Sequence, residues 1–200
     1  MSLTTFISHT FQKFSRLKLQ YQELPKKAIV IGGPHTSYWD GILMAVAFWD
    51  AKRNFNFLVK DSAMKSPFGP IIRKVGGISV DRSSAHGLVD QIATKAAESD
   101  EFLLVIAPKG TRSPREFWKS GFYHIARKAN IPVVLGYIDS ATKTYGWEHG
   151  IMLTGDMRAD MDLIRAFYAD KEGINPQWKS TPRLRGEEDS EPLGNEESSK

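Results

Sequence analysis

A histidine and an aspartate stand five residues apart in the segment His35-Thr-Ser-Tyr-Trp-Asp40. On one regular helix they would point to different faces. With His35 in a loop and Asp40 in the first helical turn, the carboxylate can reach one imidazole nitrogen. Such a carboxylate fixes the tautomer and leaves the other nitrogen to accept a proton. We expect His35 and Asp40 to form a catalytic pair, while a helix start capped by Ser37 and Asp40 is the alternative.

Basic residues and glycines follow three other β-rich runs, and we expect them to bind an anionic substrate. Sites in open α/β sheets gather at the carboxyl ends of strands. There a glycine lets backbone N–H groups approach a ligand, and an arginine offers a planar fork to phosphate oxygens. For each basic residue taken singly, a solvated surface role remains the alternative. The candidate residues are Lys60, Arg82, Lys109, Gly110, Thr111 and Arg112.

Several kinds of chemistry are excluded or disfavoured by the sequence. The chain has no cysteine, which removes disulfides, thiolate metal sites and an acyl-cysteine intermediate. It contains no G-x-S-x-G, Walker, G-x-G-x-x-G or H-E-x-x-H motif. The histidines other than His35 lack carboxylates at ligand-like spacing, so we expect no metal site and no bound cofactor.

Six apolar, β-rich runs alternate with stretches of helical periodicity along the chain. The expected strands are 28–31, 55–59, 78–81, 102–107, 133–138 and 151–154. The expected helices are 37–52, 85–98, 114–129 and 156–167. Nearly continuous apolar runs suit strands that helices cover on both faces. The pattern predicts a single-domain α/β sandwich with a mixed, mainly parallel central sheet flanked by helices.

The two ends of the chain differ from this alternating region. Residues 1–22 carry apolar side chains at three-to-four-residue spacing with basic residues between them, which predicts an N-terminal amphipathic helix. Such a helix can pack on the domain or lie in a membrane interface. Residues 181–200 have no aromatic residue and no apolar period, so we expect a disordered acidic tail. The domain between them spans residues 23–180.

The charge is unevenly distributed along the 200 residues. The formal net charge is +4, yet residues 1–185 carry 26 basic and 17 acidic residues, a net of +9. A basic body favours phosphate-bearing substrates, anionic membranes or nucleic acid. Aromatic residues do not interleave with Lys and Arg in a stacking stripe, so we expect no nucleic-acid partner. With no secretion signal and no apolar stretch of spanning length, we expect a cytoplasmic protein.

Four blocks in this order resemble those of the glycerolipid acyltransferase family, of the lysophosphatidic acid acyltransferase type. They are 35–40, 76–82, 110–112 and Ile131-Pro132-Val-Val. The resemblance implies transfer of an acyl group from acyl-CoA or acyl carrier protein to a hydroxyl of glycerol 3-phosphate or a lysophospholipid. It also implies His35 as general base, Asp40 as its orienting partner, and Arg82 and Arg112 as phosphate ligands. Pro132 would lie near the acyl site, and the protein would associate peripherally with the inner face of the membrane.

The third block departs from the family pattern Pro-Glu-Gly-Thr-Arg. Here it reads Pro108-Lys-Gly-Thr-Arg112, so Lys109 puts an ammonium where the family has a carboxylate. A role of that carboxylate in orienting glycerol hydroxyls would be lost. Two interpretations follow: an enzyme with a different acceptor, or a catalytically silent relative that binds phospholipid.

Overall fold

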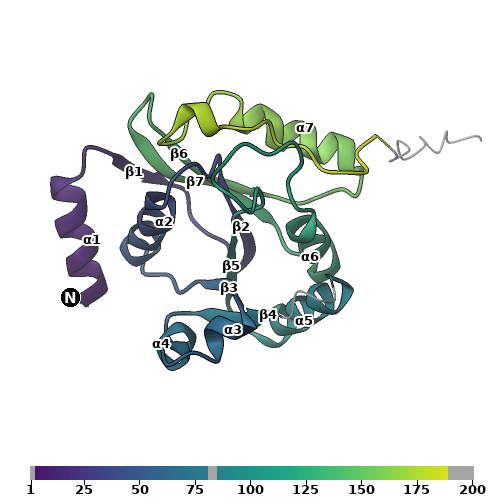
Figure 1. The fold of residues 1–200 in the computed structure, drawn as a ribbon, viewed down its shortest axis with the longest axis horizontal. Coiled ribbons are helices and arrows are strands. Elements are labelled where there is room, and N and C mark those ends of the chain that lie inside the picture. Colours follow the sequence, from purple (N-terminus) through teal and green to yellow (C-terminus); the bar gives the residue numbers. More distant parts are fainter. Residues whose placement is uncertain (1–2, 81–84, 189–200) are drawn as a thin grey trace, which may run out of the picture.

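The computed structural model describes residues 3–80 and 85–188, and it is built around a seven-stranded sheet (Figure 1). The order across the sheet is β1-β7-β6-β2-β5-β3-β4. All neighbouring pairs are parallel except β6 and β7, which are antiparallel. The strands are β1 (Lys18–Tyr21), β2 (Lys27–Gly33), β3 (Asn56–Lys60), β4 (Gly77–Val80), β5 (Phe102–Ile106), β6 (Val133–Asp139) and β7 (Thr144–Ile151). The mixed, mainly parallel sheet that we predicted is confirmed.

Helices cover both faces of the sheet, because alternate side chains of the central strands point to opposite faces. In β2, Ala28 and Val30 pack against α2, while Ile29 and Ile31 belong to the core beneath α5, α6 and α7. Figure 1 shows α1 outermost on the side of α2. The helices are α1 (Leu3–Phe14), α2 (Trp39–Asp50), α3 (Asp61–Met64), α4 (Gly69–Lys74), α5 (Ala85–Glu98), α6 (Gly121–Ala129), α7 (Met157–Tyr168) and the 3-10 turn η1 (Pro176–Trp178).

Two elements predicted within residues 23–180 differ clearly from the structure in their bounds. The strand expected at 151–154 lies earlier, as β7, which forms a hairpin with β6. The helix expected at 114–129 begins only at Gly121. Backbone N–H groups between 115 and 119 are used in other contacts: Trp118 N donates to Arg183 O at 2.7 Å and Lys119 N to Pro108 O at 2.8 Å. These bonds hold the segment as an extended loop against the C-terminal chain.

The predicted N-terminal helix 1–22 is too long. It ends at Phe14, and Lys18–Tyr21 instead forms β1, which pairs with β7. The ring of Tyr21 stacks on Trp147 at 4.9 Å, and this contact favours a strand at the sheet edge over continuation of the helix.

The predicted disordered tail begins too early at residue 181. Leu184 is buried and forms an isolated parallel bridge with Trp118. Glu187 is buried as well, accepts a hydrogen bond from Leu184 N and pairs with Arg165. Residues 181–188 therefore belong to the folded domain, and the tail predicted over 189–200 lies outside the described residues.

Candidate active site

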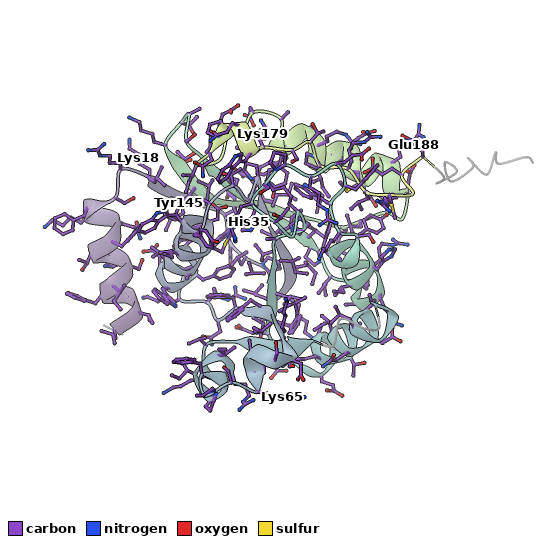
Figure 2. The ribbon with its side chains drawn as sticks, in the orientation of Figure 1. Lys18, His35, Lys65, Tyr145, Lys179 and Glu188 are labelled. Atoms are coloured by element: carbon purple, nitrogen blue, oxygen red, sulfur yellow. The ribbon has the colours of Figure 1, made fainter. Side chains whose placement is uncertain are left out.

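His35 leaves the carboxyl end of β2 in an unusual backbone conformation. Its φ is +48°, in the left-handed region that residues with a side chain seldom adopt. This turn brings imidazole Nδ1 to 3.1 Å from Asp40 Oδ2. The two side chains are 20% and 11% exposed, so the pair is shielded while remaining accessible. Figure 2 shows His35 near the centre of the molecule.

Asp40 is held by the same loop that it orients. Its Oδ2 accepts hydrogen bonds from the backbone N–H groups of Thr36 at 2.8 Å and Ser37 at 2.9 Å. Asp40 lies in the first turn of α2, where the helix dipole favours a negative charge. The predicted pair and its helix-capping alternative are thus one structure, because the carboxylate binds the loop amides and the imidazole together. Oδ1 of Asp40 is buried without a hydrogen-bond partner among the described residues.

With Nδ1 directed at the carboxylate, imidazole Nε2 has no hydrogen-bond partner in the described part of the chain. A cavity of about 90 Å³ adjoins the pair and is lined mainly by apolar groups. Its walls include Gly32 and Gly33 of β2, Met44 of α2 and Tyr137 of β6. The arrangement offers a proton acceptor beside a small apolar cavity.

The chain after α7 crosses the His35 loop and fixes it from outside. Asn175 N donates to Thr36 Oγ1 at 3.0 Å, and Asn175 Nδ2 donates to the carbonyl of Thr36 at 2.8 Å. Gly173, at φ +68°, approaches so closely that a Cβ there would lie 2.7 Å from Thr36 Oγ1. We refer to residues 171–180 as the strap. No motif in the sequence marked these residues as part of the site.

Lys109 is completely buried beneath the strap. Its ammonium donates hydrogen bonds to the carbonyl oxygens of Arg112 at 3.1 Å and Trp178 at 2.7 Å. Burial lowers the pKa of Lys109, and the nearby carboxylate of Asp40 partly offsets that effect. The expected contact between Lys109 and a substrate does not match this placement, because the side chain is enclosed by protein. Its position instead makes it a link between the third block and the strap.

Arg112 contacts the loop that carries His35. The guanidinium of Arg112 stacks over the ring of Tyr38, with its Cζ 3.6 Å from the ring centroid. Tyr38 belongs to the His35 loop and is highly exposed, so it places the arginine on the His35 side. Gly110 adopts φ +69°, as a tight turn requires, and Thr111 Oγ1 accepts from Ser113 N at 3.3 Å. Helix α6 begins only at Gly121, so its N-terminus does not directly follow this turn.

The other predicted binding residues are more dispersed. Lys60 is exposed at the carboxyl end of β3, which lies two strands from β2 in the sheet. Arg82 lies outside the described residues. Pro132 precedes β6, so it lies at the amino end of this strand, whereas His35 follows the carboxyl end of β2. Since β2 and β6 run parallel, about five strand residues, or roughly 15 Å, separate the two levels.

The described residues contain no cluster of three or more histidine, aspartate or glutamate side chains that could hold a metal ion. Nor does any described helix have the length and apolarity needed to cross a bilayer.

Known proteins resemble this chain in sequence profile and in fold. Residues 16–137 match the family model described as Acyltransferase. No curated protein sequence matches the chain significantly. Among solved structures, the fold resembles the crystal structure of the 1-acyl-sn-glycerophosphate (LPA) acyltransferase PlsC from Thermotoga maritima, with a TM-score of 0.52 and 14% sequence identity. The similarity covers 82% of this chain and 74% of that one, and at this identity it establishes the fold alone.

Proposed function

Because the chain belongs to the acyltransferase family, we propose that it transfers a fatty acyl group from a thioester donor to a glycerolipid acceptor. The donor is acyl-CoA or acyl carrier protein, and the acceptor is a hydroxyl of a lysophospholipid or glycerol 3-phosphate. One observation carries the proposal: His35 Nδ1 lies 3.1 Å from the carboxylate of Asp40, which two loop amides hold in place. This geometry is suited to a histidine that takes a proton through Nε2.

The proton transfers in this reaction need only the two substrates and the pair of His35 and Asp40. Nε2 of His35 accepts the proton of the acceptor hydroxyl while its oxygen bonds to the thioester carbonyl carbon. The tetrahedral intermediate then collapses, the carbon–sulfur bond breaks, and the imidazolium returns its proton to the departing thiolate. The carboxylate of Asp40 stabilises the imidazolium between these steps. Since a thioester is already activated, base catalysis and correct positioning of the substrates supply the main acceleration.

The acceptor's phosphate is bound, in this proposal, by Arg112 together with Lys60 and Arg82. Arg112 supports the assignment because Tyr38 holds its guanidinium beside the His35 loop. A planar guanidinium can bind two phosphate oxygens at once. The solved relative with a similar fold is described as acting on 1-acyl-sn-glycerophosphate, a phosphate-bearing acceptor.

The charge reversal at Lys109 raised the alternative of a silent phospholipid-binding protein. Its ammonium bonds to two backbone carbonyls within the protein, so the charged group is directed at the protein backbone and not at a substrate. His35 and Asp40 keep their geometry beside it. These observations favour an active enzyme in which the contact once made by the family glutamate is absent.

Attachment to a membrane surface through α1 is the last part of the proposal. The apolar side chains Leu3, Phe6 and Phe14 are 74%, 56% and 80% exposed. The inward face is mostly polar: Ser8 and Gln12 both bond to Asp50 at the end of α2, and Phe11 packs against the core. A helix that docks by this face and presents other apolar side chains outward is suited to the interface of a bilayer.

The test measures free thiol released from acyl-CoA while glycerol 3-phosphate, lysophosphatidate and other lysophospholipids are offered in turn. The wild-type chain should release thiol only with a phosphate-bearing acceptor. His35→Gln should abolish that release, whereas His149→Gln, at an exposed position of β7, serves as the matched control. Absence of acceptor-dependent release with every acceptor and with either donor would overturn the proposed function.

A further inference from the structure

A groove of about 1,110 Å³ lies apart from the His35 cavity, between the first turns of α5, helix α6 and the loop 115–121. In Figure 1, α5 and α6 lie on the side of the sheet away from α1 and α2. Both helices follow parallel strands, so their N-termini lie at the sheet edge from which the His35 loop also emerges. The proposed reaction gives this groove no role.

The rim of the groove is strongly cationic. Lys128 is paired with Asp90, and Arg127 donates to the carbonyl of Leu153 at 2.8 Å. Arg115 and Lys119, by contrast, are exposed and have no ion-pair partner among the described residues. The cationic residues are Arg115, Lys119, Arg127, Lys128 and Arg185, and the acidic ones are Asp90 and Glu116. The excess of positive charge favours a ligand with several negative charges.

The floor of the groove is apolar and contains an aromatic ring flanked by guanidinium groups. Leu88, Phe117 and Ile125 are among its apolar lining. The Cζ atoms of Arg183 and Arg185 lie 5.5 and 5.4 Å from the centre of the Phe117 ring. Rings and guanidinium planes are surfaces on which a nucleobase stacks. A site that combines such a surface with free cations fits a nucleotide better than it fits inorganic phosphate.

The groove is connected directly to the third block of the active site. Lys119 N donates to the carbonyl of Pro108, next to Lys109, at 2.8 Å. The side chain of Lys119 passes Gly110 so closely that a Cβ at Gly110 would lie 3.0 Å from Lys119 Cε. A ligand held in the groove is therefore within reach of the turn that leads to Arg112.

We propose that this groove binds the phosphorylated adenosine end of an acyl-CoA donor. The inference rests on the proposed function and selects acyl-CoA over a carrier protein. CoA joins an adenine to several phosphates and extends from them through a flexible arm to the thioester. The phosphates meet Arg115, Lys119 and Arg185, the base stacks at Phe117, and the arm passes Gly110 toward His35.

Binding of CoA without any acceptor tests the inference independently of catalysis. Calorimetry compares the full chain, an Arg115→Ala/Lys119→Ala variant and a Lys74→Ala/Lys95→Ala control that removes the same charge elsewhere. Because each lost cation removes a charge-assisted contact, we expect the dissociation constant for CoA to rise at least about tenfold in the groove variant only. Added salt should weaken binding to the wild type, whereas pantetheine, which lacks the nucleotide, should not respond to the groove substitutions. Unfolding curves that match the wild type establish that the variants are folded.

Three results would overturn the inference: no CoA binding to the wild type, equal CoA affinity in both variants, or groove-dependent binding of an acyl carrier protein in place of CoA. A second donor, acyl-pantetheine, separates failure of the proposed function from failure of the groove assignment. Acyl-pantetheine transfer that depends on His35 reports the proposed function without a nucleotide. If that transfer is absent while CoA binding still depends on Arg115 and Lys119, the proposed function fails and the groove assignment stands.

Discussion

The ammonium of Lys109 lies 2.7 Å from the carbonyl oxygen of Trp178 and joins the third sequence block to the strap. Its second bond, to the carbonyl of Arg112, fixes the turn that presents the Arg112 guanidinium. The strap in turn binds Thr36, the neighbour of His35, through Asn175. Lys109, whose positive charge replaces the negative charge of the family pattern, thus connects the turn that carries Arg112 to the loop that carries His35.

This placement predicts the result of restoring the family residue. Lys109→Glu would put a carboxylate against two carbonyl oxygens and should lower the free energy of unfolding by about 3–5 kcal/mol. Lys109→Met fills the same space and should cost less, about 1–3 kcal/mol, for two unpaired carbonyls. Denaturant unfolding curves measure both. A Lys109→Glu protein as stable as the wild type and more active would show that the lysine is a lesion in the acceptor site.

The stacking of Arg112 on Tyr38 predicts an effect on acceptor binding. Tyr38→Leu removes the ring face and should raise KM for a phosphate-bearing acceptor about two- to fivefold, with kcat little changed. Tyr38→Phe retains the ring and is the matched control. Initial rates over a range of acceptor concentrations give both constants. Equal KM values for the leucine and phenylalanine variants would show that the stacking does not position Arg112.

Asp139 predicts a pH-dependent contribution to stability at the end of β6. Burial alone would raise its pKa, yet hydrogen bonds from Thr142, Ala141 and Glu172 hold the pKa below 3.8. The unfolded chain keeps the ordinary pKa of 3.8, so between that value and the lowered pKa of the folded protein it binds more protons. The contribution of Asp139 to stability is therefore complete above pH 3.8 and is lost as pH falls through the lowered pKa.

The corresponding variant is Asp139→Asn. At neutral pH it should be less stable than the wild type by about 1–3 kcal/mol, and the difference should shrink below pH 3.8. Unfolding curves at several pH values measure it, with Asp100→Asn on the surface as control. A difference that stays constant down to the acid limit would contradict the assignment.

The outward face of α1 predicts binding to vesicles that contain anionic lipid. A Phe6→Ser/Phe14→Ser variant leaves the polar contacts with Asp50 intact and should reduce the partition into vesicles at least about tenfold. Leu163→Ser removes an exposed apolar residue from α7 and is the control. Flotation of the protein with vesicles measures the partition. Deletion of residues 1–20 is a poorer test because it would remove most of β1. Unchanged flotation of the double variant would exclude α1 as the membrane contact.

The central strands and the edge strand β4 could be predicted from the sequence, whereas β1 and β7 on the other side of the sheet could not. β2, β5 and β6 are covered on both faces, so they appear as continuous apolar runs such as 102–106. β1 and β7 alternate less clearly and carry exposed polar residues. At Gly146 a Cβ would lie 1.6 Å from Gln20 O, so this glycine marks the close approach of β1 to β7 and not a break in the strand.

Within the site, contacts between residues close in sequence could be predicted, whereas contacts between distant residues could not. His35 and Asp40 are five residues apart, so their spacing was enough to predict that they could meet. Thr36 and Asn175 are separated by 139 positions, and no pattern in the chain indicated that the strap would cover the loop. Lys109 looked like a surface cation by type, and only the packing of Trp178 against its loop reveals that it is buried.

The measurement that tests the account most directly is thiol release from acyl-CoA with lysophosphatidate, compared between the wild type and His35→Ala. We expect acceptor-dependent release by the wild type and a loss of at least about 100-fold in kcat for the variant, since the substitution removes the general base. A His35→Ala protein with an unfolding curve like that of the wild type would establish that the loss is chemical. Transfer by this variant at the wild-type rate would contradict the assignment of His35 as the base.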